Sequence, residues 1–159
     1  MGTNYGRLEV QQFACLDDNY GYLLHDYDTQ LTACIDTPDV AAIEAALAKQ
    51  GWQLTHIFNT HHHFDHAGGN LQLKKKTGAI IIGPRAEAAR IPGIDIQLGD
   101  QDEYRFGKHL MVAYETPGHT IGHIVYYLAK AGIVFVGDTL FSLGCGRLFE
   151  GTPAQMWAS

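Results

Sequence analysis

Paired cysteines, a long apolar run and an excess of basic residues are all missing from this 159-residue sequence. Its three cysteines, Cys15, Cys34 and Cys145, are odd in number and form no CxxC pair, which argues against a disulfide framework and a cysteine zinc site. No segment approaches the roughly 18 uninterrupted apolar residues of a membrane span, and the opening MGTNYGRLEV has no apolar stretch of signal-peptide length. We therefore expect no membrane partner and a reducing, cytoplasmic location.

The charge balance argues against a nucleic-acid partner. The formal net charge is -6 and the one cationic run is Lys74 to Lys76, whereas phosphate binding needs a clustered basic excess. Lysines that close a helix are explained by the helix dipole. With 46% hydrophobic residues the chain has enough apolar material for one core, and we predict a single domain over residues 1–159.

Most periodic segments of the sequence predict β-strands. Alternating or β-rich runs bounded by Gly, Asp, Asn or Pro are LEVQQFA, YGYLLH, LTACID, HIFNT, AIIIG, LMVAYET, HIVYYL and IVFVGD. One helix is expected after Thr37, as its N-cap, with Pro38 at its first position and Gly51 as its stop. A second, shorter helix should run from Gly69 to Lys76. Together these signals indicate a layered α/β fold.

The segment THHHFDHAG holds four of the nine histidines of the chain. If HIFNT is a buried strand, the cluster leaves its C-terminal end, which is where α/β folds place reactive groups. Alternate side chains of an extended segment share a face, so His61 and His63 can converge on one metal ion. The same alternation aims His62 elsewhere, and we interpret it as a bystander.

The same segment continues with a carboxylate and imidazole pair for a second metal ion, and two metal ions would draw further ligands from downstream. Asp65 and His66 should face the cavity once the chain bends, and His119 lies in the turn TPGHT. Asp138 ends the run IVFVGD, and its two carboxylate oxygens could bridge two ions. Imidazole nitrogen and carboxylate oxygen suit zinc, iron and manganese.

The remaining histidines and Cys145 have simpler explanations. His25, His56 and His109 are expected to be ordinary core or surface residues. His123, four residues after His119, is expected to be a hydrogen-bonded residue behind the ligands. A metal-activated water makes a thiolate nucleophile unnecessary, so Cys145 is interpreted as a small packing residue.

The combination THHHFDHAGG, ETPGHTIGH, VGDTLF and GCGRLFEGTPAQMW resembles the metallo-β-lactamase superfamily and, within it, the glyoxalase II (hydroxyacylglutathione hydrolase) family. The HxHxDH motif identifies the superfamily, and GCGRLFEGT is the family-specific part. The resemblance implies an αββα sandwich and two divalent metal ions, zinc above all, with iron or manganese as alternatives. It assigns His61, His63 and His119 to one ion, Asp65 and His66 to the other, and Asp138 to both.

The resemblance also implies hydrolysis of a small-molecule glutathione thioester, S-D-lactoylglutathione, to D-lactate and glutathione in methylglyoxal detoxification. Asp65 and Asp138 would be the catalytic carboxylates, with Asp65 orienting the attacking water. Arg147, Leu148 and Phe149 match a substrate-binding loop that often has lysine at its first position and tyrosine at its third. Arg147 keeps the cation, whereas Phe149 lacks a hydroxyl that could bond the peptide.

Members of the glyoxalase II family continue beyond the last residue of this chain, with a further histidine ligand and a C-terminal helical region. The helix that Thr152 and Pro153 predict stops almost at once, so we expect a C-terminally truncated domain. Its second metal would bind more weakly, by about 10- to 100-fold. The missing part would expose a sheet edge or an apolar face, which would favour self-association.

Other functions remain open on the sequence. Persulfide dioxygenases use a single iron, and lactonases share the HxHxDH motif. Asp65, His66 and GCGRLFEGT favour two metals and hydrolysis. A third alternative is a fragment that binds metal but is catalytically deficient, and activity per bound metal ion would distinguish it from an enzyme.

Overall fold

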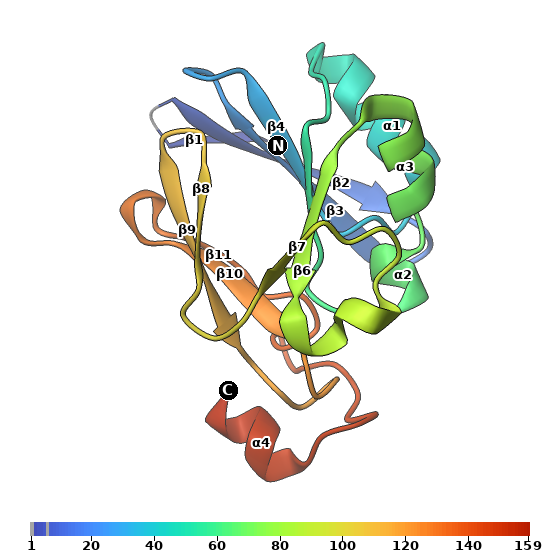
Figure 1. The fold of residues 1–159 in the computed structure, drawn as a ribbon, viewed down its shortest axis with the longest axis vertical. Helices are drawn as coiled ribbons and strands as arrows, with labels where there is room; N and C mark the ends of the chain where they lie inside the picture. Colours follow the sequence, from blue (N-terminus) through green and yellow to red (C-terminus); the bar gives the residue numbers. More distant parts are fainter. Residues whose placement is uncertain (1, 6) are drawn as a thin grey trace.

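The fold consists of two β-sheets packed face to face, with helices on the outer side of the larger sheet (Figure 1). The computed structural model describes residues 2–5 and 7–159, with side chains from residue 7 onward. The seven-stranded sheet contains β1 (Gly2–Tyr5), β2 (Leu8–Cys15), β3 (Asn19–Asp26), β4 (Leu31–Ile35), β5 (His56–Phe58), β6 (Ile80–Pro84) and β7 (Ile96–Leu98), in that order. The four-stranded sheet, in the order β11-β10-β9-β8, contains β8 (Glu103–Phe106), β9 (His109–Glu115), β10 (Ile124–Leu128) and β11 (Ile133–Phe135).

Strand direction changes within the larger sheet, and this change places the site. Strands β1 to β4 pair antiparallel, whereas β4 to β7 pair parallel. The parallel crossovers run through α1 (Val40–Gln50) and then through α2 (Phe64–Ala67) and α3 (Asn70–Thr77). Parallel strands end at the same edge of a sheet, so the loops that follow β4 and β5 lie side by side.

Two apolar cores hold the layers together. Between the sheets, Leu24, Phe58 and Tyr126 are fully buried in one cluster. Between the larger sheet and the helices, Ile43 of α1 and Ile57 of β5 are fully buried in a second cluster. Strand β5 therefore contributes to both cores, and its lack of an exposed face explains why the run HIF shows no polar alternation.

All eight predicted strands are present, and three further strands were missed. Strands β1, β7 and β8 are only three or four residues long, too short for a clear period-2 signal. The predicted N-cap of the first helix was wrong: Asp39, not Thr37, accepts the hydrogen bond from Ala42 N at 3.1 Å. Thr37 is fully buried, and its hydroxyl instead donates to Asn70 Oδ1 at 2.8 Å. Gly51 ends the helix as expected, with φ of 70°.

The short helices complete the structure around the two sheets. The second predicted helix forms as α3, and two 3-10 segments are η1 (Arg85–Arg90) and η2 (Ala129–Ala131). Helix α4 (Pro153–Ala158) begins with a capping box between Thr152 and Gln155. In the described residues, no helix is both long and apolar enough to cross a membrane.

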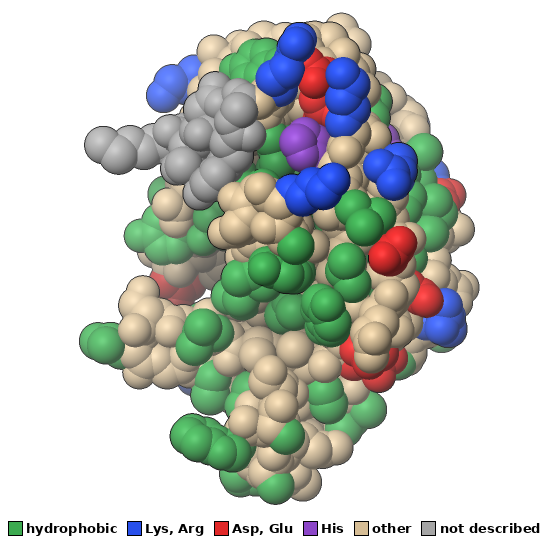
Figure 2. Space-filling view, turned by 90° about the vertical axis from the view of Figure 1, so that its left-hand side faces the viewer, with side chains coloured by type: hydrophobic (Ala, Val, Ile, Leu, Met, Phe, Trp, Pro, Cys, Tyr) green, Lys and Arg blue, Asp and Glu red, His purple; other side chains and the backbone are tan. Residues whose placement is uncertain are grey.

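The outer side of the four-stranded sheet carries exposed apolar side chains. Tyr114, Tyr127 and Val134 are 39%, 38% and 49% exposed. From the side on which β8, β9 and β11 lie in Figure 1, the surface shows apolar side chains across its middle and Lys and Arg at one end (Figure 2). Self-association through such a face remains a prediction.

Candidate metal centre

The predicted ligands gather where the two sheets meet at the C-terminal ends of β4 and β5. His61 and His63 follow β5, and Asp65 and His66 lie in α2, which starts directly after His63. His119 comes from the loop between β9 and β10, and Asp138 from the loop after β11. Five of these side chains form two close groups and Asp65 lies beside one of them, although the six come from three separate segments.

One group of nitrogens is formed by His61, His63 and His119. His63 Nδ1 lies 3.2 Å from His61 Nε2 and 3.0 Å from His119 Nε2. His61 is fully buried and His119 is 3% exposed. Three imidazole nitrogens that face one another at this spacing offer three lone pairs to one point.

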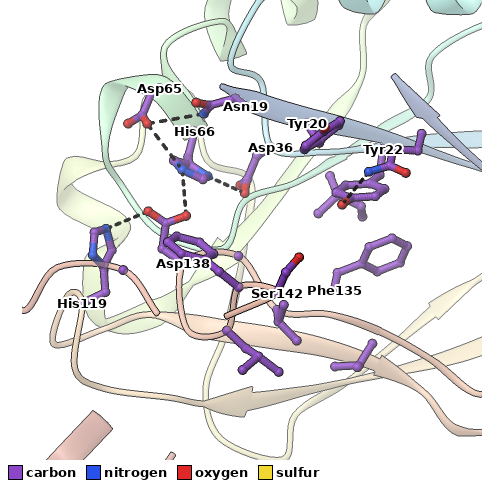
Figure 3. A pocket seen from close by; sticks show the side chains of 18 of the residues that line it. Asn19, Tyr20, Tyr22, Asp36, Asp65, His66, His119, Phe135, Asp138 and Ser142 are labelled. Atoms are coloured by element: carbon purple, nitrogen blue, oxygen red, sulfur yellow. Dashed lines mark hydrogen bonds and ion pairs between the residues drawn. The ribbon is translucent and has the colours of Figure 1, made fainter. Parts of the chain in front are cut away.

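Asp138 joins this group to a second group, which consists of His61, His66 and Asp138. Its Oδ2 lies 3.1 Å from His119 Nε2, and its Oδ1 lies 3.3 Å from His66 Nε2. Figure 3 shows the carboxylate between the two imidazoles. Each oxygen therefore serves one group, which is the arrangement that a bridging carboxylate needs.

Asp65 lies at the margin of the second group. Its Oδ2 is 3.6 Å from His66 Nε2 and 3.5 Å from Asn19 Nδ2, and its side chain is 51% exposed (Figure 3). His61, rather than Asp65, completes the tight group around His66. Asp65 thus faces both the second group and the open cavity.

Hydrogen bonds on the outer ring nitrogens fix how the histidines point. His66 Nδ1 donates to Asp36 Oδ2 at 2.8 Å. Thr60 donates its hydroxyl to Asp36 at 2.8 Å, so it accepts from His61 Nδ1, 2.9 Å away. His119 Nδ1 donates to the backbone carbonyl of Arg147 at 2.6 Å. These bonds place a proton on each Nδ1 and direct the three Nε2 atoms inward.

The donor set fits divalent metal ions. Burial, followed by the neighbouring histidines, holds the pKa of His61 well below its ordinary value. Burial also opposes protonation of His66, but Asp36 and then Asp138 raise its pKa to about 10, so this position favours positive charge. Burial raises the pKa of Asp138, but the hydrogen bond from His66 and the charges of the neighbouring histidines together outweigh it, and the net shift is downward. His61 is held as a neutral imidazole and Asp138 as a carboxylate, which are the forms that bind zinc, iron or manganese, whereas His66 would release a proton on binding a metal ion.

His123 lies behind Asp138, as the sequence predicted. Its Nε2 accepts the backbone N–H of Asp138 at 3.1 Å, and its Nδ1 lies 2.9 Å from Thr116 Oγ1. Burial lowers the pKa of His123 to about 3, which keeps Nε2 available as an acceptor. Gly137 has φ of 50°, and a Cβ there would lie 2.6 Å from His123 Nε2. The turn before Asp138 therefore requires glycine.

His62 points away from both groups. Its Nδ1 lies 2.7 Å from Glu87 Oε2, a carboxylate that is 1% exposed. The alternation argument placed His62 correctly, but nothing in the sequence marked Glu87 as its partner.

A cavity of about 930 Å³ opens beside the centre, and Arg147 and Phe149 belong to its lining. The ring of Phe149 lies 5.4 Å from that of His63 and 5.3 Å from that of His119, so it covers the first group. Leu148 is 38% exposed and is not part of this lining. Cys145 is exposed, so its interpretation as a packing residue was wrong: the loop after Asp138 lies at the surface and buries little.

Sequence reasoning missed several residues that shape the centre. Asp36 accepts from both Thr60 and His66, and it has a positive φ of 59°, a strained conformation for a residue other than glycine. The sequence did hold a signal for Asp36, because LTACID ends in Asp36 as HIFNT ends in Thr60. Strands β4 and β5 pair parallel, so these two ends lie side by side. Tyr20 and Tyr22 line the cavity from β3, and no local motif singles them out.

Curated relatives match almost the whole of this chain. A Brucella ovis protein named hydroxyacylglutathione hydrolase is 60% identical over 153 residues, which cover 96% of this chain and 60% of the relative. A protein of the same name from Brucella abortus matches to the same extent. The chain thus spans about 60% of the length of these relatives.

Solved structures share the fold. ETHE1 from Myxococcus xanthus superposes with a TM-score of 0.81 and 32% identity, covering 93% of this chain and 66% of that one. The B3 metallo-beta-lactamase BLEG-1 gives 0.81 at 23% identity, covering 94% and 82%. TTHA1623 in a di-iron-bound form gives 0.73 at 24%, covering 87% and 77%. The last two comparisons concern the fold alone.

The family model described as the metallo-beta-lactamase superfamily matches residues 28–156, a range that holds all six clustered side chains. The expected α/β class is confirmed, with both sheets and the helical layer on the larger sheet present in the described residues. The chain belongs to the metallo-beta-lactamase superfamily.

Proposed function

We propose that this chain carries the metal centre of a hydroxyacylglutathione hydrolase, which hydrolyses the thioester S-D-lactoylglutathione to D-lactate and glutathione. The observation that carries the proposal is the position of Asp138, whose two carboxylate oxygens lie 3.1 Å from His119 Nε2 and 3.3 Å from His66 Nε2. A single carboxylate between two histidine groups supports a two-metal rather than a one-metal site. The name shared by the 60%-identical relatives supports the substrate.

The residues have separate roles in this proposal. His61, His63 and His119 would hold one ion, His66 and Asp65 would hold the other, and Asp138 would contribute to both. Zinc is the proposed metal, with iron or manganese as alternatives that use the same ligands. Divalent ions in such a centre supply a water of lowered pKa and a positive charge for the developing oxyanion.

Asp65 and Asp138 are the proposed catalytic carboxylates. Asp65 is half-exposed and belongs to the cavity lining, so its free oxygen can accept a proton from the attacking water and orient it. Asp138 is fixed by the hydrogen bond from its own backbone N–H to His123. The leaving thiolate needs little assistance, because a thiol is already a good leaving group.

The cavity wall supports recognition of a glutathione thioester. Arg147 offers a cation for a substrate carboxylate, and the ring of Phe149 offers an apolar surface directly above the first histidine group. Phe149 has no hydroxyl, so its contact with the peptide is limited to packing. Leu148 lies between these two residues in the sequence without belonging to the cavity lining.

The proposal is tested by measuring loss of S-D-lactoylglutathione by the zinc-loaded 159-residue chain, with metal content determined on the same sample. Chelator-sensitive hydrolysis with about two zinc ions per chain is expected. Oxygen consumption with glutathione persulfide, or hydrolysis of lactones without hydrolysis of the thioester, would assign the centre to another activity. Full metal occupancy without turnover of any of these substrates would contradict the catalytic proposal.

A further inference from the structure

Glu87 is a buried carboxylate that lies outside the proposed ligand set. It lies in η1, the 3-10 segment Arg85–Arg90 that follows β6, and it is 1% exposed. Burying a carboxylate is costly unless hydrogen bonds satisfy its oxygens. The partners of Glu87 therefore indicate what the buried charge holds in place.

The two oxygens of Glu87 serve two different loops. Oε2 accepts from the backbone N–H of His62 at 2.7 Å and lies 2.7 Å from His62 Nδ1. Oε1 accepts from the backbone N–H of Gly122 at 3.1 Å. His62 lies between two proposed ligands in sequence, and Gly122 follows the proposed ligand His119 by three residues. One carboxylate thus connects the segments that supply all three members of the first histidine group.

The backbone at Gly122 packs closely against Glu87 and its neighbour Ala86. A Cβ added at Gly122 would lie 2.4 Å from Glu87 Cγ and 2.9 Å from Ala86 Cβ. The backbone of the His119 loop therefore rests directly on η1. Close contact and hydrogen bonding together set the separation of the two loops.

A second carboxylate links the same region to the loop that follows Asp138. Glu150 accepts from Ile121 N at 2.9 Å and from Arg90 Nη1 at 2.6 Å, and Arg90 Nη2 lies 3.6 Å from Glu87 Oε1. His62 Nε2 lies 3.8 Å from Glu150 Oε1. The sequence places Glu150 directly after Phe149, so the loop that covers the centre is tied to the same network.

We propose that Glu87 is a positioning residue for the metal centre, which holds the histidine segment and the His119 loop at the separation that metal binding requires, with Glu150 supporting it from the third loop. This inference rests on the proposed metal centre. Residues that orient ligands typically change metal affinity by about 10- to 100-fold when they are replaced.

Glu87→Gln is a sharp test because it keeps the shape of the side chain. The amide has one acceptor oxygen and one donor NH2 group. The backbone N–H of either His62 or Gly122 would therefore face the NH2 group, and two donors would oppose each other. We expect Glu87→Gln to weaken zinc binding at least about 10-fold. The absorption bands of bound cobalt(II), which report ligand geometry, should shift as well.

Asp26→Asn is the matched control. Asp26 is fully buried, its Oδ1 accepts from Asp28 N at 2.8 Å, and its Oδ2 accepts from Lys108 N at 3.1 Å. It therefore connects two loops as Glu87 does. Asp26 is the last residue of β3, whereas the cavity is lined by Asn19 at the other end of that strand. Asp26→Asn should lower the unfolding midpoint of the metal-free protein while zinc affinity and the cobalt spectrum stay at wild-type values.

Zinc dissociation constants from chelator competition, measured where each variant is folded, decide the proposal. A Glu87→Gln protein that is as destabilised as Asp26→Asn but binds zinc like wild type would overturn it. If Glu87→Gln does not fold, the more exposed Glu150→Gln should weaken zinc binding, and wild-type affinity there would overturn the proposal instead. Absence of thioester hydrolysis by zinc-loaded wild type would contradict the proposed function only, because the zinc affinities still decide the role of Glu87.

Discussion

Asp36 and His66 lie 30 positions apart in the sequence, yet Asp36 Oδ2 accepts a hydrogen bond from His66 Nδ1 at 2.8 Å. The same carboxylate accepts from the hydroxyl of Thr60, which in turn accepts from His61 Nδ1. Asp36 thereby fixes the ring orientation of one histidine in each group. A carboxylate behind a metal-binding imidazole keeps the proton on the outer nitrogen and makes the inner one a better ligand.

Asp36→Asn is expected to weaken metal binding by about 10- to 100-fold, because the amide NH2 group would face either the backbone N–H of Thr60 or the two donors at Oδ2, the Thr60 hydroxyl and His66 Nδ1. Zinc affinity measured by chelator competition checks this expectation. Asp95→Asn is the control, since Asp95 also accepts from a backbone N–H, that of Ile81, but on the helical side of the sheet. Equal affinities for Asp36→Asn and wild type would show that Asp36 does not orient the ligands.

Asp138→Ala is expected to remove bound metal and hydrolysis together, because both oxygen contacts, to the His119 and the His66 sides, disappear. His61→Ala should have the same effect, since His61 belongs to both groups. Asp65→Ala should lose less metal, because its carboxylate is half-exposed and 3.6 Å from His66 Nε2. Metal analysis and thioester assays on the three variants check this order, and an Asp138→Ala protein with full metal content would contradict the bridging role.

His62→Ala is expected to leave the number of bound metal ions unchanged, because its ring points to Glu87 and away from the centre. Removing the ring leaves the backbone bond from His62 N to Glu87 in place but deprives the buried carboxylate of one partner. Stability should fall by about 1–3 kcal/mol. Urea unfolding measures that cost, and loss of metal in His62→Ala would overturn the assignment of this histidine as a non-ligand.

The stabilising contribution of Glu150 to the metal-free protein should be lost in acid. The hydrogen bond from Arg90, followed by that from Ile121 N, lowers the pKa of Glu150 from 4.5 to about 2. Because the folded-state pKa is depressed, this stabilisation is fully present above pH 4.5 and is lost as pH falls toward 2.

Urea unfolding of metal-free wild type and Glu150→Gln across that range checks this expectation. The two proteins should differ at pH 7 and converge toward pH 2. A difference in unfolding free energy that stays constant over the whole range would contradict it.

The strand-rich pattern and the histidine spacing carry much of the fold and of the centre. Strand β9 buries Met111 and Ala113 on one face and leaves Tyr114 exposed on the other, so its alternation is visible in the sequence. The alternation within His61-His62-His63 depends only on an extended backbone, and it separates the inward histidines from the outward one. Local geometry of this kind requires no knowledge of the tertiary structure.

Short strands and long-range partners could not be read in the same way. Strands β7 and β8 are too short to show a period, and Thr37 looks like a helix cap until Asn70 takes its hydroxyl. Cys145 looks like a packing residue in the sequence, but its loop lies at the surface. Each of these outcomes depends on which segments lie next to each other after folding.

The sequence by itself determined the kind of chemistry, because the ligand types and their spacing are local properties of one short segment and two turns. Only the tertiary structure decided how the ligands are held. Asp36 and Glu87 act across distances in the chain that no local pattern spans, and they meet the histidine segment because parallel strands end at one edge of the sheet. Buried carboxylates must find donors wherever the fold supplies them, and here those donors belong to the loops that form the centre.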